Sequence, residues 1–418
     1  MKDRRFFFSV CCILLAGLMM SGTTSCGFLS VRAAELSDGY TRTATDEGQI
    51  TDDFKTSMAD FSLDLFRGTL GEDNQNSLVS PMSAVMCLAL IANGTDGETR
   101  AQIEKALNMK IEALNKCLYA YRNALKTEKD CKLALANSVW YREKGLTVNE
   151  SFLQTCADWY NAAQYAAPFD ATTARDMNNW VKENTDGMIK EIAKENDVAS
   201  SVMYLINTLV FDAKWEEKYE KKQILDDVFT CHDGTKSKIT MMRSDENRLL
   251  KTDNAVGFAK NYKGGTYSFV GLLPDEGTDV YDFAASLTGE KWLSMWQNQS
   301  NASLEVKIPE FKYEADSILN DTLAAMGMTD MFDGAKADFS ALGHSEGGNL
   351  YCSKIEQKTV IDVSRNGTKA AAVTWGEIKC TSAEPITPIF ISLDRPFVYA
   401  IVDNTTGLPL FLGIVAGL

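Results

Sequence analysis

The sequence has 418 residues, 45% of them hydrophobic, which is ample for a buried core in one large domain or two ordinary ones. Its formal net charge of −15 argues against nucleic-acid binding and against a basic membrane-docking face, because both require clustered cations. The chain has two histidines, His232 and His344, which removes most histidine-based metal sites and proton relays. The sequence also has no Gly-rich phosphate loop or dinucleotide fingerprint, and we expect neither a metal nor a cofactor.

Residues 1–25 have the pattern of an export signal. Three basic residues precede an apolar run from Phe6 to Met20, which is too short to span a bilayer comfortably. Ordinary cleavage would release a secreted protein. Alternatively, Cys26 and the small residues before it resemble the lipidated cysteine of bacterial lipoproteins, although Thr23 replaces the usual Leu. Both routes place the protein outside the cytoplasm, and a lipid on Cys26 is its only expected contact with a membrane.

Residues 26–50 are polar and lack a period, which predicts a flexible spacer. A single domain, residues 51–418, is expected to follow, because no repeat or second boundary interrupts it. Its early segments have helical periods, beginning with the apolar stripe Phe54, Met58, Phe61 and Leu65. Strand patterns occur at 133–141, 201–211, 269–273, 303–308, 350–363 and 389–414. Helices gathered early and strands gathered late predict an α+β domain with large sheets.

The cysteines beyond Cys26 are scattered, odd in number and lack any Cys-x-x-Cys pair. This pattern predicts free thiols that pack as small apolar residues, rather than a disulfide framework or a metal site. They are Cys87, Cys117, Cys131, Cys156, Cys231, Cys352 and Cys380.

A stretch of small residues follows an apolar strand near the C-terminus. The alternating residues 360–363 end at Asn366-Gly367, which predicts a strand that turns out into a long exposed loop. Every second residue from Thr368 is small, so this face of the segment can lie down as a strand in a tightly packed sheet. The small face consists of Thr368, Ala370, Ala372, Thr374 and Gly376, and the other face of Lys369, Ala371, Val373 and Trp375.

These residues resemble the hinge of the serpins, whose pattern is Gly-Thr-Glu-Ala-Ala-Ala followed by further small residues. Lys369 departs from the family's Glu, on the face that tolerates charge. Further serpin-like motifs occur in family order along most of the chain, and their combination is highly specific. They are Leu78-Val-Ser-Pro-Met-Ser83, Ala136-Asn-Ser-Val-Trp140, Asn207-Thr-Leu-Val-Phe-Asp-Ala-Lys-Trp215, Asp233-Gly-Thr235, Met241-Met242, Ile308-Pro309 and Asp403-Asn-Thr-Thr-Gly-Leu-Pro-Leu-Phe-Leu-Gly413.

The resemblance implies a serpin fold with three β-sheets, eight or nine helices and an exposed reactive-centre loop. It also implies a monomeric suicide-substrate inhibitor of serine proteases, with cysteine proteases as further targets, and no enzymatic activity of its own. In such proteins the protease cleaves the loop and is trapped as a covalent acyl-enzyme while the hinge inserts as a new central strand. The implied hinge residues are Gly367, Thr368, Ala370, Ala371, Ala372, Val373 and Thr374.

The family's usual spacing from Gly367 places the reactive bond between Thr381 and Ser382. The loop is a few residues longer than in many serpins, so cleavage after Lys379 or Cys380 is an alternative. Thr381 suits elastase-like proteases with small specificity pockets, whereas Lys379 suits trypsin-like enzymes or cysteine proteases.

The resemblance also assigns residues to the control of sheet opening, and two positions depart from the family pattern. Arg365 and Glu310 stand where many serpins have Glu and Lys, which predicts an ion pair with both signs reversed where the loop enters the sheet. Gln357 stands where many serpins have His, so this cluster should not titrate. The assigned residues are Ser80, Ser83, Asn207, Trp215, Glu310, Gln357 and Arg365.

Two alternative functions fit parts of the sequence. A non-inhibitory serpin-fold protein, acting as a binding or chaperone-like surface protein, would carry the same motifs. The segment from Gly343 to Gly347 fits the G-x-S-x-G pattern of α/β-hydrolases. No histidine follows Ser345 and no buried strand precedes it, which favours a loop over an esterase site. The small hinge residues favour the inhibitor, because bulky or charged residues facing inward would slow insertion.

Overall fold

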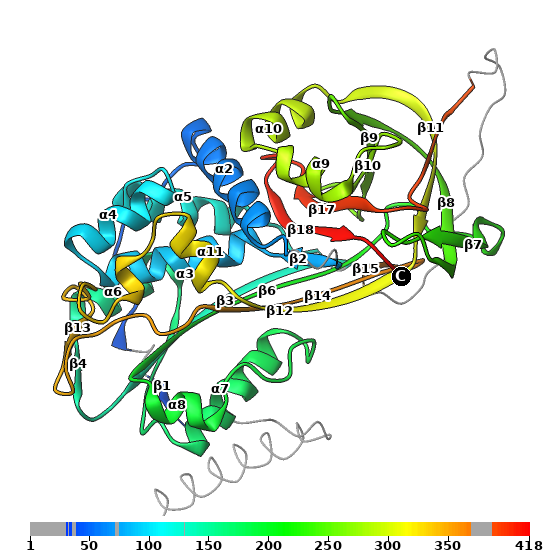
Figure 1. Cartoon of the computed structure of the whole chain (residues 1–418). Helices are drawn as coiled ribbons and strands as arrows, with labels where there is room; N and C mark the ends of the chain where they lie inside the picture. Colours follow the sequence, from blue (N-terminus) through cyan, green and yellow to red (C-terminus); the bar gives the residue numbers. More distant parts are fainter. Residues whose placement is uncertain (1–30, 32, 36–38, 72–74, 129, 369–386) are drawn as a thin grey trace, which may run out of the picture.

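The computed structural model describes residues 31–418 apart from 32, 36–38, 72–74, 129 and 369–386 (Figure 1). Most helices gather at one end of the molecule, and a long seven-stranded sheet runs beneath them towards a nine-stranded sheet (Figure 1). A third sheet has two strands, β4 Leu146–Val148 and β13 Gly343–Ser345. The predicted α+β class with three sheets is therefore confirmed.

The seven-stranded sheet has the order β1-β5-β3-β6-β15-β14-β12. Its long strands β3 and β6 pair antiparallel, from Cys131 opposite Ala213 to Tyr141 opposite Met203. The two-residue strand β15 lies between β6 and β14. The bounds are β1 Ala34–Glu35, β5 Ala163–Ala167, β3 Cys131–Arg142, β6 Met203–Lys214, β15 Gly367–Thr368, β14 Glu356–Ser364 and β12 Phe311–Ile318.

The nine-stranded sheet has the order β16-β11-β8-β9-β10-β17-β18-β2, with β7 paired to β8. Every residue of β10, β17 and β18 is buried, as expected for strands that read as continuous apolar runs. The bounds are β16 Ile389–Ser392, β11 Ser300–Pro309, β8 Lys236–Lys251, β9 Ala255–Asn261, β10 Tyr267–Pro274, β17 Phe397–Asp403, β18 Pro409–Val415, β2 Ser77–Val79 and β7 Ile224–Thr230.

The described residues contain ten α-helices, where eight or nine were expected. The shortest, α8 and α11, have six residues each and lie next to strands in the chain. Within the described ranges, no helix is both long and apolar enough to cross a bilayer. The bounds are α2 Asp52–Gly68, α3 Pro81–Gly94, α4 Gly97–Ala106, α5 Ile111–Ala124, α6 Glu150–Tyr160, α7 Ala171–Asn184, α8 Glu195–Ser200, α9 Val280–Ser286, α10 Gly289–Gln297 and α11 Asn320–Ala325, with 3-10 turns at Lys221–Gln223 and Asp330–Phe332.

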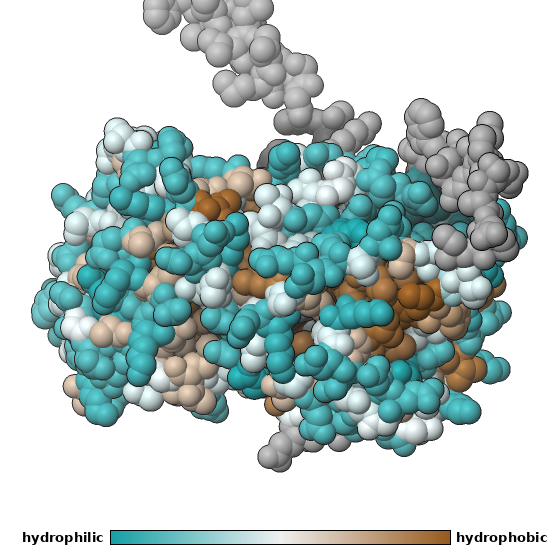
Figure 2. All heavy atoms as spheres, turned by 90° about the horizontal axis from the view of Figure 1, so that it is seen from above, coloured by the Kyte–Doolittle hydropathy of each residue, from teal (hydrophilic) through white to brown (hydrophobic). Residues whose placement is uncertain are grey.

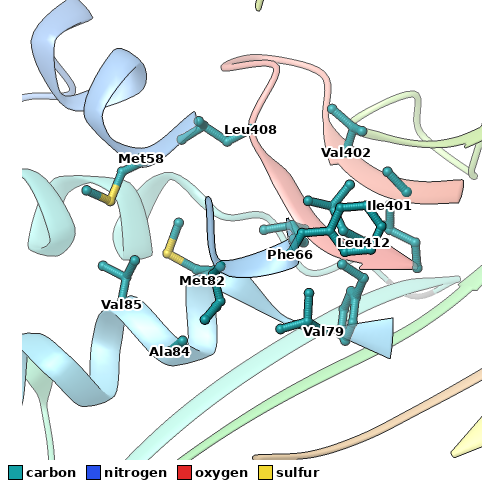
Figure 3. Close-up of a cluster of buried hydrophobic side chains, with 14 of the residues drawn as sticks. Met58, Phe66, Val79, Met82, Ala84, Val85, Ile401, Val402, Leu408 and Leu412 are labelled. Atoms are coloured by element: carbon teal, nitrogen blue, oxygen red, sulfur yellow. The ribbon is translucent and has the colours of Figure 1, made fainter. Parts of the chain in front are cut away.

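Helix α3 lies in the main core, where it contacts both β6 and β18. Pro81 begins the helix, since its fixed φ suits the first helical position. Nearly all residues of α3 are apolar, which is the pattern of a helix buried on all sides. The predicted stripe of α2 packs against it. Figure 3 shows side chains of this core: Met58, Phe66, Val79, Met82, Ala84, Val85, Ile401, Val402, Leu408 and Leu412.

A second core covers the other face of the seven-stranded sheet beneath α7 and α8. Trp140 of β3 stacks on Tyr165 of β5 with ring centroids 4.0 Å apart. Trp180 of α7, Val198 of α8 and Ile206 of β6 belong to the same cluster. β3 and β6 are thus covered on both faces, which explains why their sequences are apolar at consecutive positions.

Part of the predicted spacer, residues 26–50, lies against the helices. The backbone N–H of Thr43 donates to Asp158 of α6 at 2.6 Å. The Lys116 ammonium of α5 pairs with Asp46 at 2.7 Å. The described part of this segment is therefore attached to the helical layer, although its sequence shows no period.

The six described cysteines are all free, as predicted, and all of them are at least partly buried. Burial raises the pKa of the Cys87 thiol to about 12, so this thiol stays protonated at neutral pH. The predicted export signal, residues 1–25, lies outside the described residues, as do Cys26 and Cys380.

Seen from above, the surface is mostly hydrophilic, in keeping with the acidic composition, and one hydrophobic area lies over the half that holds the nine-stranded sheet (Figure 2). Five large hydrophobic side chains are exposed in the described residues. They are Val228, Ile318, Tyr351, Ile389 and Phe390.

Candidate functional site

The first two predicted hinge residues already lie in the seven-stranded sheet. Thr368 of β15 is opposite Val363 of β14 on one side and Ala213 of β6 on the other. Gly367 has φ +125°, and a Cβ there would lie 2.1 Å from the carbonyl oxygen of Ala213. Position 367 therefore requires glycine, both for its backbone angle and for the close approach of β6.

A buried hydroxyl pair holds the hinge to the core. The Tyr262 hydroxyl lies 2.7 Å from the Thr368 hydroxyl, and both side chains are buried. The Tyr262 ring stacks on Trp215 with centroids 4.6 Å apart and an interplanar angle of 8°. The Trp215 indole N–H donates to the Ser364 carbonyl at 2.8 Å. Burial raises the pKa of Tyr262, so its hydroxyl stays neutral and the contact does not titrate near neutral pH.

Beyond β15, towards the N-terminal ends of β6 and β14, a cleft separates these two strands. No backbone ladder joins these two strands directly in the described part of the chain. The cleft contains a cavity of about 50 Å³, too small for a substrate or cofactor. Its walls are residues 205–209 of β6 and 355–359 at the start of β14, with Val181 of α7 and Ile189 on one face.

Four predicted residues meet at the start of α3, on the face of the sheet that α3 covers. The Gln357 amide donates to the Ser80 carbonyl at 2.8 Å and accepts from the Ser80 N–H at 2.9 Å. The Ser83 hydroxyl donates to Asn207, whose amide donates to Asn137 at 2.8 Å. One helix end therefore contacts both walls of the cleft, Gln357 on β14 and Asn207 on β6.

The predicted ion pair with reversed signs is present. Arg365 forms a two-pronged contact with Glu310, with nitrogen–oxygen distances of 2.7 and 2.8 Å, and its backbone N–H also donates to Glu310 at 2.9 Å. These hydrogen bonds from Arg365 lower the pKa of Glu310. The pair joins the turn after β14 to the start of the neighbouring strand β12. It therefore lies on one side of the cleft and anchors the residues that precede the hinge.

The remaining predicted site residues lie outside the described residues. They are the hinge residues Ala370, Ala371, Ala372, Val373 and Thr374, the reactive-bond residues Thr381 and Ser382, and the alternatives Lys379 and Cys380.

The esterase alternative is not supported by the geometry around Ser345. This serine ends the short strand β13, is buried, and its hydroxyl accepts from the Gly347 N–H at 3.1 Å. Turns follow β13 instead of the helix that a nucleophile elbow requires. In the described segments, no three or more His, Cys, Asp or Glu side chains are grouped so that they could hold a metal ion.

Sequence reasoning missed Tyr262, which is 106 residues from Thr368 in the chain. A tyrosine before Lys263-Gly-Gly265 reads as the end of an ordinary strand. Its role follows only from the stacking on Trp215 and the contact with Thr368.

Comparisons with known proteins agree on one family. A family model described as serpin (serine protease inhibitor) matches residues 56–417. Leukocyte elastase inhibitor A from Rattus norvegicus is 32% identical and covers 85% of this chain and 97% of its own. Glia-derived nexin from Rattus norvegicus is 28% identical and covers 82% and 88%. The native state of the thermophilic serpin tengpin matches with a TM-score of 0.88 and 44% identity, over 93% of this chain and 100% of tengpin.

Tyr262→Phe should loosen the hinge, because it removes a buried hydrogen bond worth about 1 kcal/mol. We expect amide hydrogen exchange at Thr368 to rise about fivefold, measured by mass spectrometry of the peptide that contains it. Tyr399→Phe is the control, since this buried tyrosine donates to Ser77 away from the hinge. Equal exchange at Thr368 in the two variants would contradict the assignment.

Gln357→His should introduce a pH dependence that the parent cluster lacks. Protonated imidazole cannot accept from the Ser80 N–H, so the folded-state pKa of the new histidine would lie below its unfolded value. The stability contributed by this contact is present above pH ~6.5 and lost as the pH falls. Urea unfolding should show the variant losing about 1–2 kcal/mol relative to the parent between pH 7 and pH 5. An equal dependence of the unfolding free energy on pH in the two proteins would argue against the contact.

Arg365→Glu should speed the spontaneous loss of the native form, seen on native gels during incubation at raised temperature. The pair is partly exposed and contributes about 1 kcal/mol, so the expected change is about fivefold. The double variant Arg365→Glu with Glu310→Lys restores opposite charges and should return to the parent rate. An unaltered single variant would count against a role for the pair.

Proposed function

The chain belongs to the serpin family, and from this premise we propose that it is a suicide-substrate inhibitor of serine proteases. The observation that carries the proposal is the position of Gly367 and Thr368 at the head of the cleft between β6 and β14. A hinge that starts inside the sheet continues into the cleft in a register that is already fixed.

The side chains that follow Thr368 support this function. Because strand side chains alternate, Ala370, Ala372 and Thr374 would face the core on the same side as Thr368. All are small, so they enter a close-packed interior without the cost of overpacking. The bulkier residues of the segment, such as Trp375, would face α7.

Insertion supplies the energy for trapping. A strand of about a dozen residues that gains roughly 1 kcal/mol net per hydrogen bond, together with packing, releases on the order of 10 kcal/mol. The protease is trapped when insertion is faster than hydrolysis of the acyl-enzyme.

In the proposed reaction, the serine hydroxyl of the protease attacks the carbonyl carbon of Thr381. The C–N bond to Ser382 breaks, the proton passes to the leaving amine, and the protease is left as an ester of Thr381. Insertion then moves the ester across the sheet before water attacks it. A cysteine protease would form the corresponding thioester, and cleavage after Lys379 or Cys380 would follow the same scheme.

We propose an elastase-like protease as the target, because Thr381 suits a small specificity pocket. A relative named leukocyte elastase inhibitor A is in keeping with this choice. The pattern of residues 1–25 supports an extracellular location, either secreted or held at the surface by a lipid on Cys26. The protein would act as a monomer on its protease.

The test is a panel of elastase, trypsin, subtilisin and papain, analysed on denaturing gels with mass spectrometry of the released C-terminal peptide. We expect a stable covalent complex with elastase and a released peptide that begins at Ser382. The nicked protein should melt about 20 °C above the intact one, because roughly 10 kcal/mol is gained on insertion.

Two hinge variants provide matched controls. Ala372→Glu places a charge on the inward face and should turn the inhibitor into a substrate, whereas Ala371→Glu places it on the outward face and should retain the complex. Cleavage of the parent without a complex and without a rise in Tm would favour the non-inhibitory binding or chaperone-like protein.

A further inference from the structure

An ion pair spans the lower end of the cleft. The Lys354 ammonium, just before β14, lies 3.0 Å from the Asp197 carboxylate of α8 and 2.7 Å from Glu356 of β14. Partial burial alone would lower the pKa of Lys354, but hydrogen bonds to Glu356 and Asp197 outweigh it and raise that pKa. Lys354 is therefore a permanent cation at neutral pH.

Asp197 and Lys354 belong to opposite walls of the cleft. α8 is fixed to the β6 wall, because Val198 packs in the second core and Arg142 of β3 donates to the carbonyls of Ala199 and Ser201 at 2.7 and 2.8 Å. Ile355, next to Lys354, is fixed to the α11 side, since its backbone N–H donates to the Asn320 side chain at 2.8 Å. The Asp197–Lys354 contact thus connects the walls.

The register of β15 predicts which inserted residue would arrive at this point. β15 is antiparallel to both neighbours, with Thr368 opposite Val363 and Ala213. Continued down the cleft, the same register places position 377 opposite Lys354 on one wall and Tyr204 on the other. Position 377 is Glu377, a carboxylate.

The register also determines which side of the sheet the side chain at position 377 would face. Residues directly opposite each other in an antiparallel pair point to the same side of the sheet. Tyr204 packs against the second core, the side covered by α7 and α8. Glu377 would therefore face the same side as Asp197.

We propose that Lys354 receives Glu377 when the strand inserts, and that this new ion pair replaces the pair with Asp197. The proposal rests on the proposed function, because it requires insertion. Adjacent strands are about 4.8 Å apart, so a strand entering at this level separates Asp197 from Lys354. Lys354 keeps Glu356 on its own wall throughout. The Asp197 contact holds the intact form, and the Glu377 contact fixes the end point of insertion.

The ion pairs are weak enough to exchange. The side chains of Lys354 and Asp197 are 32% and 43% exposed, which is typical of pairs worth a few tenths to 1 kcal/mol. The neighbouring Lys358 pairs with Asp316 of β12 at 2.9 Å and with Glu356 of β14 at 3.3 Å, so both of its partners lie on a single wall and insertion would not separate them. The Lys358–Asp316 pair serves as the internal control.

The first experiment measures uptake of a synthetic peptide, residues 369–379, by the intact protein on native gels. Asp197→Asn should take up the peptide about two- to fivefold faster than the parent, whereas Asp316→Asn should not. A peptide carrying Glu377→Gln should bind about two- to fivefold more weakly to the parent, while the Lys369→Gln peptide should not. The Lys354→Gln protein should bind the unaltered peptide and the Glu377→Gln peptide equally well, because position 377 then has no cation to contact.

The second experiment uses the nicked full chain and does not depend on peptide uptake. Glu377→Gln should lower the Tm of the nicked protein by about 2 °C, and Glu384→Gln, beyond the reactive bond, should leave it unchanged. Equal Tm values for these two variants, or equal uptake by Asp197→Asn and Asp316→Asn, would overturn the exchange alone. No rise in Tm on nicking the parent would overturn the proposed function and the exchange with it.

Discussion

The structure depends on the incomplete pairing between β6 and β14 in the seven-stranded sheet, which the two-residue strand β15 joins at one end. β6 and β14 run in the same direction on either side of β15, yet below Thr368 no ladder joins them in the described part of the chain. The facing edges of these strands offer backbone groups to a new strand. The surrounding packing keeps the two walls in place, because α3 covers one face of the sheet here and α7 covers the other. Contacts of Gln357 and Asn207 with the start of α3 hold each wall to the same helix.

Neutral hydrogen bonds hold the walls of the cleft to α3 and the hinge to the core, while ion pairs lie along the β14 wall and at the two ends of the cleft. The contacts of Tyr262, Trp215 and Gln357 involve groups that keep their charge state near neutral pH. The ion pairs Arg365–Glu310 and Asp197–Lys354 are partly exposed. Desolvation makes buried charges expensive, so weak pairs at the edges can be exchanged at a lower cost than pairs in the core.

The sequence predicted the parts of the site that depend on local pattern. The alternation of small residues identified Thr368 as inward-facing, and the structure buries it. The reversed charges at Arg365 and Glu310 were paired correctly because the motifs fixed their relative positions. Tyr262 and Asp197 could not be found in this way, since their partners are distant in the chain and no local period marks them. The spacer prediction rested on polar composition, which does not reveal that Thr43 and Asp46 have partners on α5 and α6.

The seating of Gly367 and Thr368 has a kinetic consequence. In sheet formation the slow event is bringing the first residues of two segments together in one of several alignments, because loop-closure entropy is lost before any contact forms. In the proposed mechanism this nucleus exists before cleavage, because Gly367 and Thr368 are already paired with both neighbouring strands, so insertion would proceed as elongation from a preformed end. The same pairing would prevent a slip of one residue, which would turn Lys369 and Trp375 into the interior during insertion.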